Sequence, residues 1–201
     1  MRILVLFLFF AASVFAQEEL NFWERRDLAR ILGTISVKPE TVTANFTIYK
    51  FSDTDTLSQD GLLLYKAPDK LKCEITDDPR SQWAIDGNIL TTEKDLKQTN
   101  YDLQKSSAIY PSINLLMDII NGEYLDEDRY ELQYASDNLS HIFGIKPKEG
   151  SYKDTILYLY FDKGIATLSN IKMFENGKNV LTIELIAPFY NTPIHDSTFR
   201  L

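Results

Sequence analysis

Hydrophobic and polar residues alternate along much of this chain, and the alternation predicts a protein built mainly of β-strands. In segment 41–48, Val42, Ala44, Phe46 and Ile48 alternate with polar residues, as in a strand buried on one face. Asp86-Gly87-Asn88 and similar turn signals separate such runs and indicate hairpins. Further strands are expected in 61–66, 70–76, 82–85, 89–92, 130–134, 141–146, 155–161, 165–174 and 180–186. Segment 189–201 lacks the pattern and is expected to form a loose tail.

Two segments show the spacing of amphipathic helices instead. In 20–37, apolar residues recur at helical spacing until Pro39 ends the pattern. Pro111 fits the first turn of a second, shorter helix, and Gly122 fits its end. The apolar stripe of this second helix lies at positions i, i+3, i+4 and i+7, which are Ile113, Leu116, Met117 and Ile120.

Short strands joined by hairpins, with two helices inserted, predict an α+β fold, mostly β, with a curved antiparallel sheet. Several strands, such as 61–66, are apolar on both faces. One face would pack against a helix. The other face would either line a cavity for an apolar ligand or complete an ordinary filled sandwich core, and the pattern leaves both interpretations open.

The first sixteen residues have the pattern of a secretory signal. Met1-Arg2 precedes an apolar run over 3–12, and Val14-Phe15-Ala16 provides the small residues of a cleavage site. The run is shorter than the roughly 20 residues that a membrane-spanning helix needs. We therefore expect 1–16 to be cleaved and 17–201 to form a single domain that works outside the cytoplasm. The alternative is a retained amphipathic helix, but the segment has no polar face.

Charge and composition exclude several classes of function. The formal net charge of −8 disfavours binding to nucleic acid or to an anionic membrane surface. Cys73 is the only cysteine, so no internal disulfide forms, and its alternating neighbours place it on an apolar strand face. His141 and His195 are not spaced with Cys or carboxylates as zinc ligands are, and no cofactor or metal is expected.

No catalytic motif is present in the sequence. It contains neither the G-x-S-x-G elbow nor the H-E-x-x-H pair, and it has no phosphate-binding or dinucleotide-binding glycine loop. We therefore expect a protein that is not an enzyme. A secreted hydrolase stays open as an alternative, because catalytic residues assembled from distant positions leave no local trace.

The order of these features resembles one protein family. A signal and an N-terminal helix precede a long first strand ending in 46–51, FTIYKF. The segment 61–74, GLLLYKAPDKLKCE, and the segment 83–88, WAIDGN, follow. The helix after Pro111 with its Leu115-Leu116 pair, the closing strand meander and the end segment 193–199 continue the match. Over nearly the whole mature chain, this order is similar to that of the periplasmic outer-membrane lipoprotein carriers, the LolA-like family.

The resemblance implies an unclosed antiparallel barrel, or half-barrel, with a helical lid and an apolar hollow for acyl chains. It implies a monomeric periplasmic carrier that receives a lipoprotein, or another lipid-linked cargo, from an inner-membrane donor and passes it to an outer-membrane acceptor. Typical members have an Arg directly before the turn proline, and this Arg tethers the lid. Here Ala67 takes that place and Lys66 lies one residue earlier, on the other strand face, which suits a divergent branch of the family.

If the hollow exists, apolar side chains of the sheet and of the lid should line it. A secreted binding or adaptor module with a filled core is the alternative, and each of these positions is equally consistent with ordinary core packing. Met117 would act as a flexible filler. The expected lipid-binding residues are Phe46, Ile48, Leu62, Leu64, Leu71, Ile75, Trp83 and Ile85 from the sheet, and Ile113, Leu116, Met117 and Ile120 from the lid.

Overall fold

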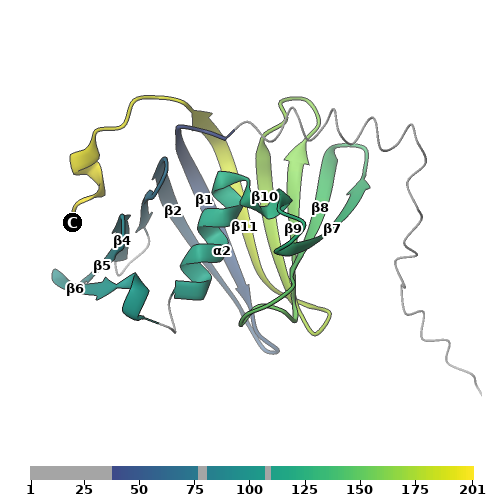
Figure 1. Ribbon diagram of the computed structural model, residues 1–201, viewed down its shortest axis with the longest axis horizontal. Helices are drawn as coiled ribbons and strands as arrows, with labels where there is room; N and C mark the ends of the chain where they lie inside the picture. Colours follow the sequence, from purple (N-terminus) through teal and green to yellow (C-terminus); the bar gives the residue numbers. More distant parts are fainter. Residues whose placement is uncertain (1–37, 77–80, 107–109) are drawn as a thin grey trace, which may run out of the picture. The chain divides into compact units, whose positions relative to one another are not determined.

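The computed structural model describes residues 38–76, 81–106 and 110–201, which form one antiparallel sheet with one α-helix against it (Figure 1). The signal segment 1–16 and the helix expected in 20–37 lie outside the described residues. The strands are β1 (Thr41–Phe51), β2 (Thr56–Lys66), β3 (Lys70–Ile75), β4 (Ser81–Asp86), β5 (Ile89–Lys94), β6 (Lys97–Asp102), β7 (Tyr130–Ser136), β8 (Ser140–Pro147), β9 (Thr155–Asp162), β10 (Leu168–Glu175) and β11 (Lys178–Tyr190).

The sheet has eleven strands among the described residues, in the order β6-β5-β4-β3-β2-β1-β11-β10-β9-β8-β7. Every neighbouring pair is antiparallel, and β1 lies between β2 and β11 near the middle of the sheet. The edge strands β6 and β7 are not paired with each other, so the barrel is not closed. The mostly-β, antiparallel half-barrel predicted from the sequence is therefore confirmed.

Turn chemistry explains which hairpins the sequence reveals. Asn176 and Gly177 connect β10 to β11 with φ values of 50° and 77°, which is the two-residue geometry that favours Asn-Gly. Asp95 and Leu96 connect β5 to β6 with φ values of 52° and 62°. Because Leu carries no turn signal and β6 is almost entirely polar, the sequence pattern does not predict β6.

The helix α2 (Tyr110–Asn121) matches the second helix predicted from the apolar stripe. Gly122 follows it with a φ of 72°, a left-handed conformation that favours glycine and ends the helix. Three short 3₁₀ helices complete the described part of the chain: η1 (Leu103–Lys105), η2 (Glu123–Leu125) and η3 (Asp196–Phe199).

The C-terminal segment is ordered against the sheet, so the expectation of a loose tail is wrong. β11 runs on to Tyr190, and η3 contacts β3 and β4. The side chain of Phe199 is only 2% exposed. Thr41 Oγ1 donates to the carbonyl of Thr192 at 2.7 Å, and Lys66 Nζ donates to the carbonyl of Ile194 at 3.0 Å. These contacts involve backbone groups and one buried ring, which leave no periodic pattern in the sequence.

Candidate functional site

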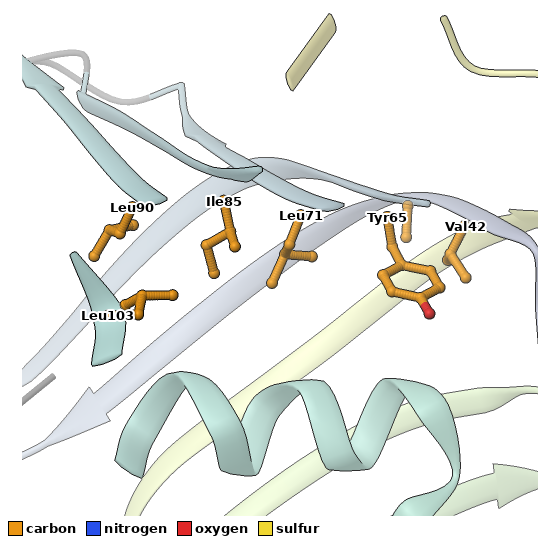
Figure 2. Close-up of a cluster of buried hydrophobic side chains, with 7 residues drawn as sticks. Val42, Tyr65, Leu71, Ile85, Leu90 and Leu103 are labelled. Atoms are coloured by element: carbon orange, nitrogen blue, oxygen red, sulfur yellow. The ribbon is translucent and has the colours of Figure 1, made fainter. Parts of the chain in front are cut away.

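A row of buried side chains crosses five neighbouring strands on the face of the sheet that meets α2. Val42 pairs with Tyr65, Tyr65 with Leu71, Leu71 with Ile85, and Ile85 with Leu90. Directly paired residues project from the same face, so the five form one continuous apolar strip. Figure 2 shows this row on the side of the sheet that faces α2.

The register places most of the predicted sheet residues on this inner face. Phe46 and Ile75 each pair with Gly61. Trp83 pairs with Cys73, which lies two residues after Leu71 on β3 and therefore on the same face. The missing side chain of Gly61 makes room for the ring of Phe46, because an added Cβ would lie 2.3 Å from Phe46 Cζ. The predicted residues on the inner face are Phe46, Ile48, Leu71, Ile75, Trp83 and Ile85.

Leu62 and Leu64 lie on the opposite, outer face of the sheet, which corrects their predicted position. Leu64 pairs with Lys72, and Leu62 pairs with Glu74 and Asn45. The segment 61–66 is apolar on both faces, so its composition could not decide which residues point inward. The pairing with β1 determines which residues of this segment point inward. Ala44 lies on the inner face opposite Leu63, so Leu63 projects from the inner face and its neighbours Leu62 and Leu64 do not.

The apolar stripe of α2 packs onto this inner face, as the helical spacing predicted. Ile113, Leu116, Met117 and Ile120 all contact the buried cluster that contains Val42, Tyr65, Leu71, Ile85, Leu90 and Leu103. Trp83 and Leu63 pack against the same cluster from the sheet. Between α2 and the β1–β5 part of the sheet, the interior is therefore a packed core.

A hollow of about 180 Å³, open on one side, lies near the C-terminal end of α2. Its walls are mostly apolar, and they come from α2, η2 and strands β1, β2, β9, β10 and β11. Of the predicted lipid-binding residues, Ile120 lines it. The lining residues are Lys38, Pro39, Val42, Leu63, Ile119, Ile120, Gly122, Tyr124, Phe161, Ala166, Thr167, Leu168, Leu185, Tyr190 and Asn191.

Sequence reasoning missed the contribution of the C-terminal strands to this hollow. Leu185 and Tyr190 reach the inner face on either side of a register shift between β1 and β11, and this shift breaks the alternation. A second shift between β9 and β10 lies next to Leu168. The apolar run 155–161, which ends in Phe161, is the sequence feature from which a contribution of these strands to the hollow could have been predicted.

A partly buried polar cluster attaches the last part of α2 to the start of β7. Asp118 is 7% exposed, and its carboxylate accepts hydrogen bonds from both terminal nitrogens of Arg129 and from the hydroxyl of Tyr130. The Arg129 Nη1 to Asp118 Oδ1 distance is 3.3 Å. Hydrogen bonding to Asp118 raises the pKa of Arg129. Burial, and after it the hydrogen bond from its own hydroxyl to Asp118, raises the pKa of Tyr130. Arg129 and Tyr130 thus stay protonated and keep donating to the carboxylate.

A groove of about 420 Å³ lies at the other end of α2. One wall is the first part of the helix, and the other is formed by the start of β7, the end of β8 and the turn that follows β8. Rings and charged side chains line it together. Its residues are Tyr110, Pro111, Asn114, Leu115, Asp128, Arg129, Tyr130, Pro147, Lys148, Glu149, Gly150, Ser151 and Tyr152.

The histidines and the acidic side chains do not assemble a recognisable reactive centre in the described part of the chain. No group of three or more His, Cys, Asp or Glu residues able to hold a metal ion occurs within 38–76, 81–106 and 110–201. His195 Nδ1 lies 2.7 Å from Ser197 Oγ and accepts from the backbone N–H of Ser197. This contact caps η3, which gives the His-Ser pair a structural role.

Comparison with known proteins identifies the family. Residues 37–201 match the sequence model of the family described as outer membrane lipoprotein carrier protein LolA. The chain belongs to the LolA family. A comparison with curated protein sequences finds no match. None of the helices in the described segments has the length and the apolar composition needed to cross a bilayer.

Solved structures share the fold of this LolA family member at low sequence identity. MucB is 8% identical with a TM-score of 0.53, and the match covers 88% of this chain and 63% of MucB. The MucA/MucB complex of Pseudomonas aeruginosa gives 8% identity and a TM-score of 0.50 over 87% of this chain and 61% of that one. A conserved protein from Thermus thermophilus gives 7% identity and a TM-score of 0.52 over 87% of this chain and 93% of that one. The present chain thus spans less than two thirds of MucB.

Residues near the turn proline of this LolA family member attach both the C-terminal segment and α2 to the sheet. Lys66 lies on the outer face and binds the C-terminal segment, with its Nζ 2.5 Å from Asp196 Oδ1. Strand alternation therefore keeps Lys66 away from α2, as predicted. On the inner face, the buried Tyr65 instead donates its hydroxyl proton to Asn121 Oδ1 at the end of α2. A phenol on β2 thus contacts the end of α2 in this protein.

Proposed function

We propose that the protein is a periplasmic carrier that shields acyl chains of lipoproteins, or of another lipid-linked cargo, on their way from the inner to the outer membrane. The family assignment supports a lipoprotein carrier. The observation that carries the proposal for this chain is the apolar hollow between α2 and the inner face of the sheet. Cleavage after Ala16 would deliver the mature chain to the periplasm, and the mass of the protein isolated from that compartment tests this.

The size of the hollow limits what it holds before the protein changes shape. A water molecule takes up about 30 Å³ in the liquid, and a methylene group is of similar size. A hollow of about 180 Å³ therefore takes only a short alkyl segment. Each buried CH₂ contributes about 0.8 kcal/mol, so a complete acyl chain binds strongly if α2 moves away from the sheet to admit it. Met117, which is unbranched, suits a contact that must repack.

Charge substitutions in the wall of the hollow and on the outer face of the sheet test the proposal. Ile120→Glu places a carboxylate in the wall of the hollow, and we expect it to abolish binding of a fluorescent fatty acid. Leu62→Glu introduces the same group on the outer face and serves as the matched control, with binding retained. Circular dichroism and thermal unfolding establish that both variants are folded. Full uptake by a folded Ile120→Glu variant would overturn the assignment of the hollow.

A binding module with a filled core is the second candidate, because α2 packs closely onto the β1–β5 part of the sheet. Such a module would bind a partner protein through its surface and would take up no lipid. A hydrophobic fluorescent probe separates the two functions, since fatty acids displace it only from a carrier. Lipid extraction followed by mass spectrometry of the protein purified from its own cells would then identify the cargo.

A further inference from the structure

The groove at the N-terminal end of α2 differs from the hollow in both size and chemistry. Its volume of about 420 Å³ is more than twice that of the hollow, at about 180 Å³. Three tyrosines and two prolines are among its lining residues: Tyr110, Tyr130, Tyr152, Pro111 and Pro147. Of these, Tyr130 and Pro147 are themselves buried, and Tyr110, Tyr152 and Pro111 are the more accessible. Tyr110 is 46% exposed, so its ring is available to a ligand. Rigid aromatic and proline rings provide contact area with little loss of side-chain entropy.

The charges in the groove argue against an anionic ligand. Arg129 and Lys148 are balanced by Asp128 and Glu149 among the lining residues. Arg129 is already paired with Asp118, and Lys148 Nζ donates to the carbonyl of Glu127 at 2.6 Å. A phosphate headgroup would find no surplus positive charge among these lining residues and would meet two carboxylates. An uncharged chain with peptide groups fits the mixture of rings and polar groups better.

The groove and the hollow lie on the same side of α2. Leu115 lines the groove, and Ile119 lines the hollow four residues further on. Residues four apart are neighbours along one face of a helix, with a rise of about 6 Å between them. A ligand with its apolar tail in the hollow would therefore have its polar part within reach of the groove.

We infer that the groove binds an extended polypeptide segment, the stretch of the cargo that directly follows its lipidated residue. This inference rests on the proposed carrier function. Extended, proline-containing peptides bind in grooves lined by aromatic rings because they are already ordered before binding. The protein thus has a two-part site, in which the hollow binds the tail and the groove selects cargo that carries a polypeptide.

Three probes, glycerol phosphate as a competitor and two variants test the inference on the full mature chain. The probes are a fatty acid, a diacylated cysteine peptide with a short Ser-Pro tail, and the same peptide without the lipid. We expect Tyr110→Ala to weaken binding of the lipidated peptide about tenfold and to leave fatty acid binding unchanged. Tyr49→Ala, on β1 and away from the groove, is the matched control and should change neither affinity.

The outcomes separate the inference from the function on which it rests. Equal loss of affinity for the lipidated peptide and the fatty acid in Tyr110→Ala, or no loss for either, would overturn the peptide site. Competition by glycerol phosphate, without competition by the unlipidated peptide, would overturn it in favour of a headgroup site. Absence of fatty acid binding in the unaltered protein would refute the carrier function instead. In that case, weak binding of the free peptide that is lost in Tyr110→Ala would still support a peptide site in the groove.

Discussion

The hydroxyl of Tyr65 on β2 donates a hydrogen bond to the side-chain oxygen of Asn121, the last residue of α2. The amide nitrogen of Asn121 in turn lies 3.5 Å from the carbonyl of Pro68, in the turn between β2 and β3. The end of the helix is thus connected to the sheet at the point where the inner row of core residues begins. Burial, with a smaller effect of Asp69, raises the pKa of Tyr65 to about 12, so the phenol stays protonated and keeps donating at neutral pH.

Removing this hydroxyl should loosen the helix without disturbing the core. We expect Tyr65→Phe to lower the free energy of unfolding by about 1–2 kcal/mol, because Asn121 loses a partly buried partner. The release of a bound fatty acid should become faster, since the end of α2 that borders the hollow is held less firmly. Urea denaturation and stopped-flow release of a fluorescent fatty acid measure the two effects. Tyr101→Phe, which alters a ring packed against the same cluster, is the control, and equal behaviour of the two variants would contradict the prediction.

The cluster around Asp118 should contribute more to stability than the exposed ion pairs do. Asp118→Asn keeps the shape of the side chain but removes the charge that Arg129 faces, and Arg129 itself is 42% exposed. Solvent therefore screens part of the interaction between the two charges. We expect the substitution to lower the free energy of unfolding by about 1–2 kcal/mol. Urea denaturation with an unchanged m value measures it. Lys105→Ala breaks the exposed pair with Asp102 and should leave stability essentially unchanged, so a similar loss in both variants would refute the special role of Asp118.

Gly61 should tolerate no side chain, because two neighbours occupy the space. A Cβ there would lie 2.3 Å from the ring of Phe46 and 2.4 Å from the backbone carbonyl oxygen of Glu74. A backbone atom in a β-ladder cannot give way as a side chain can, so Gly61→Ala should destabilise the protein by about 1–3 kcal/mol. Differential scanning calorimetry would record this as a lower Tm.

Gly144 provides the comparison within the same sheet. A Cβ at Gly144 would lie 3.2 Å from Cε1 of Tyr158, whose ring can shift slightly. Gly144→Ala should therefore lower the Tm less than Gly61→Ala. The reverse order would show that the close approach of Phe46 to Gly61 is not what restricts that position.

The elements with a clear local pattern could be predicted from the sequence, and elements fixed by distant pairing could not. Alternation identified β1, and the stripe from Ile113 to Ile120 identified α2. The face of Leu62 and Leu64 depends on register with β1, which no short segment encodes. The hollow combines α2 with strands at both ends of the chain, and register shifts in β10 and β11 hide part of its lining. The polar attachments of α2 depend on pairs such as Tyr65 and Asn121, which are 56 residues apart.

Cys73 lies on the inner face opposite Trp83, and its thiol is buried, with the residue only 4% exposed. Burial, with a smaller effect of Glu74, raises its pKa to about 12. The thiol therefore stays protonated at neutral pH, and the ionised form is the one that attacks a disulfide. The protein can therefore meet oxidising enzymes and other cysteine-containing chains without becoming covalently linked to them.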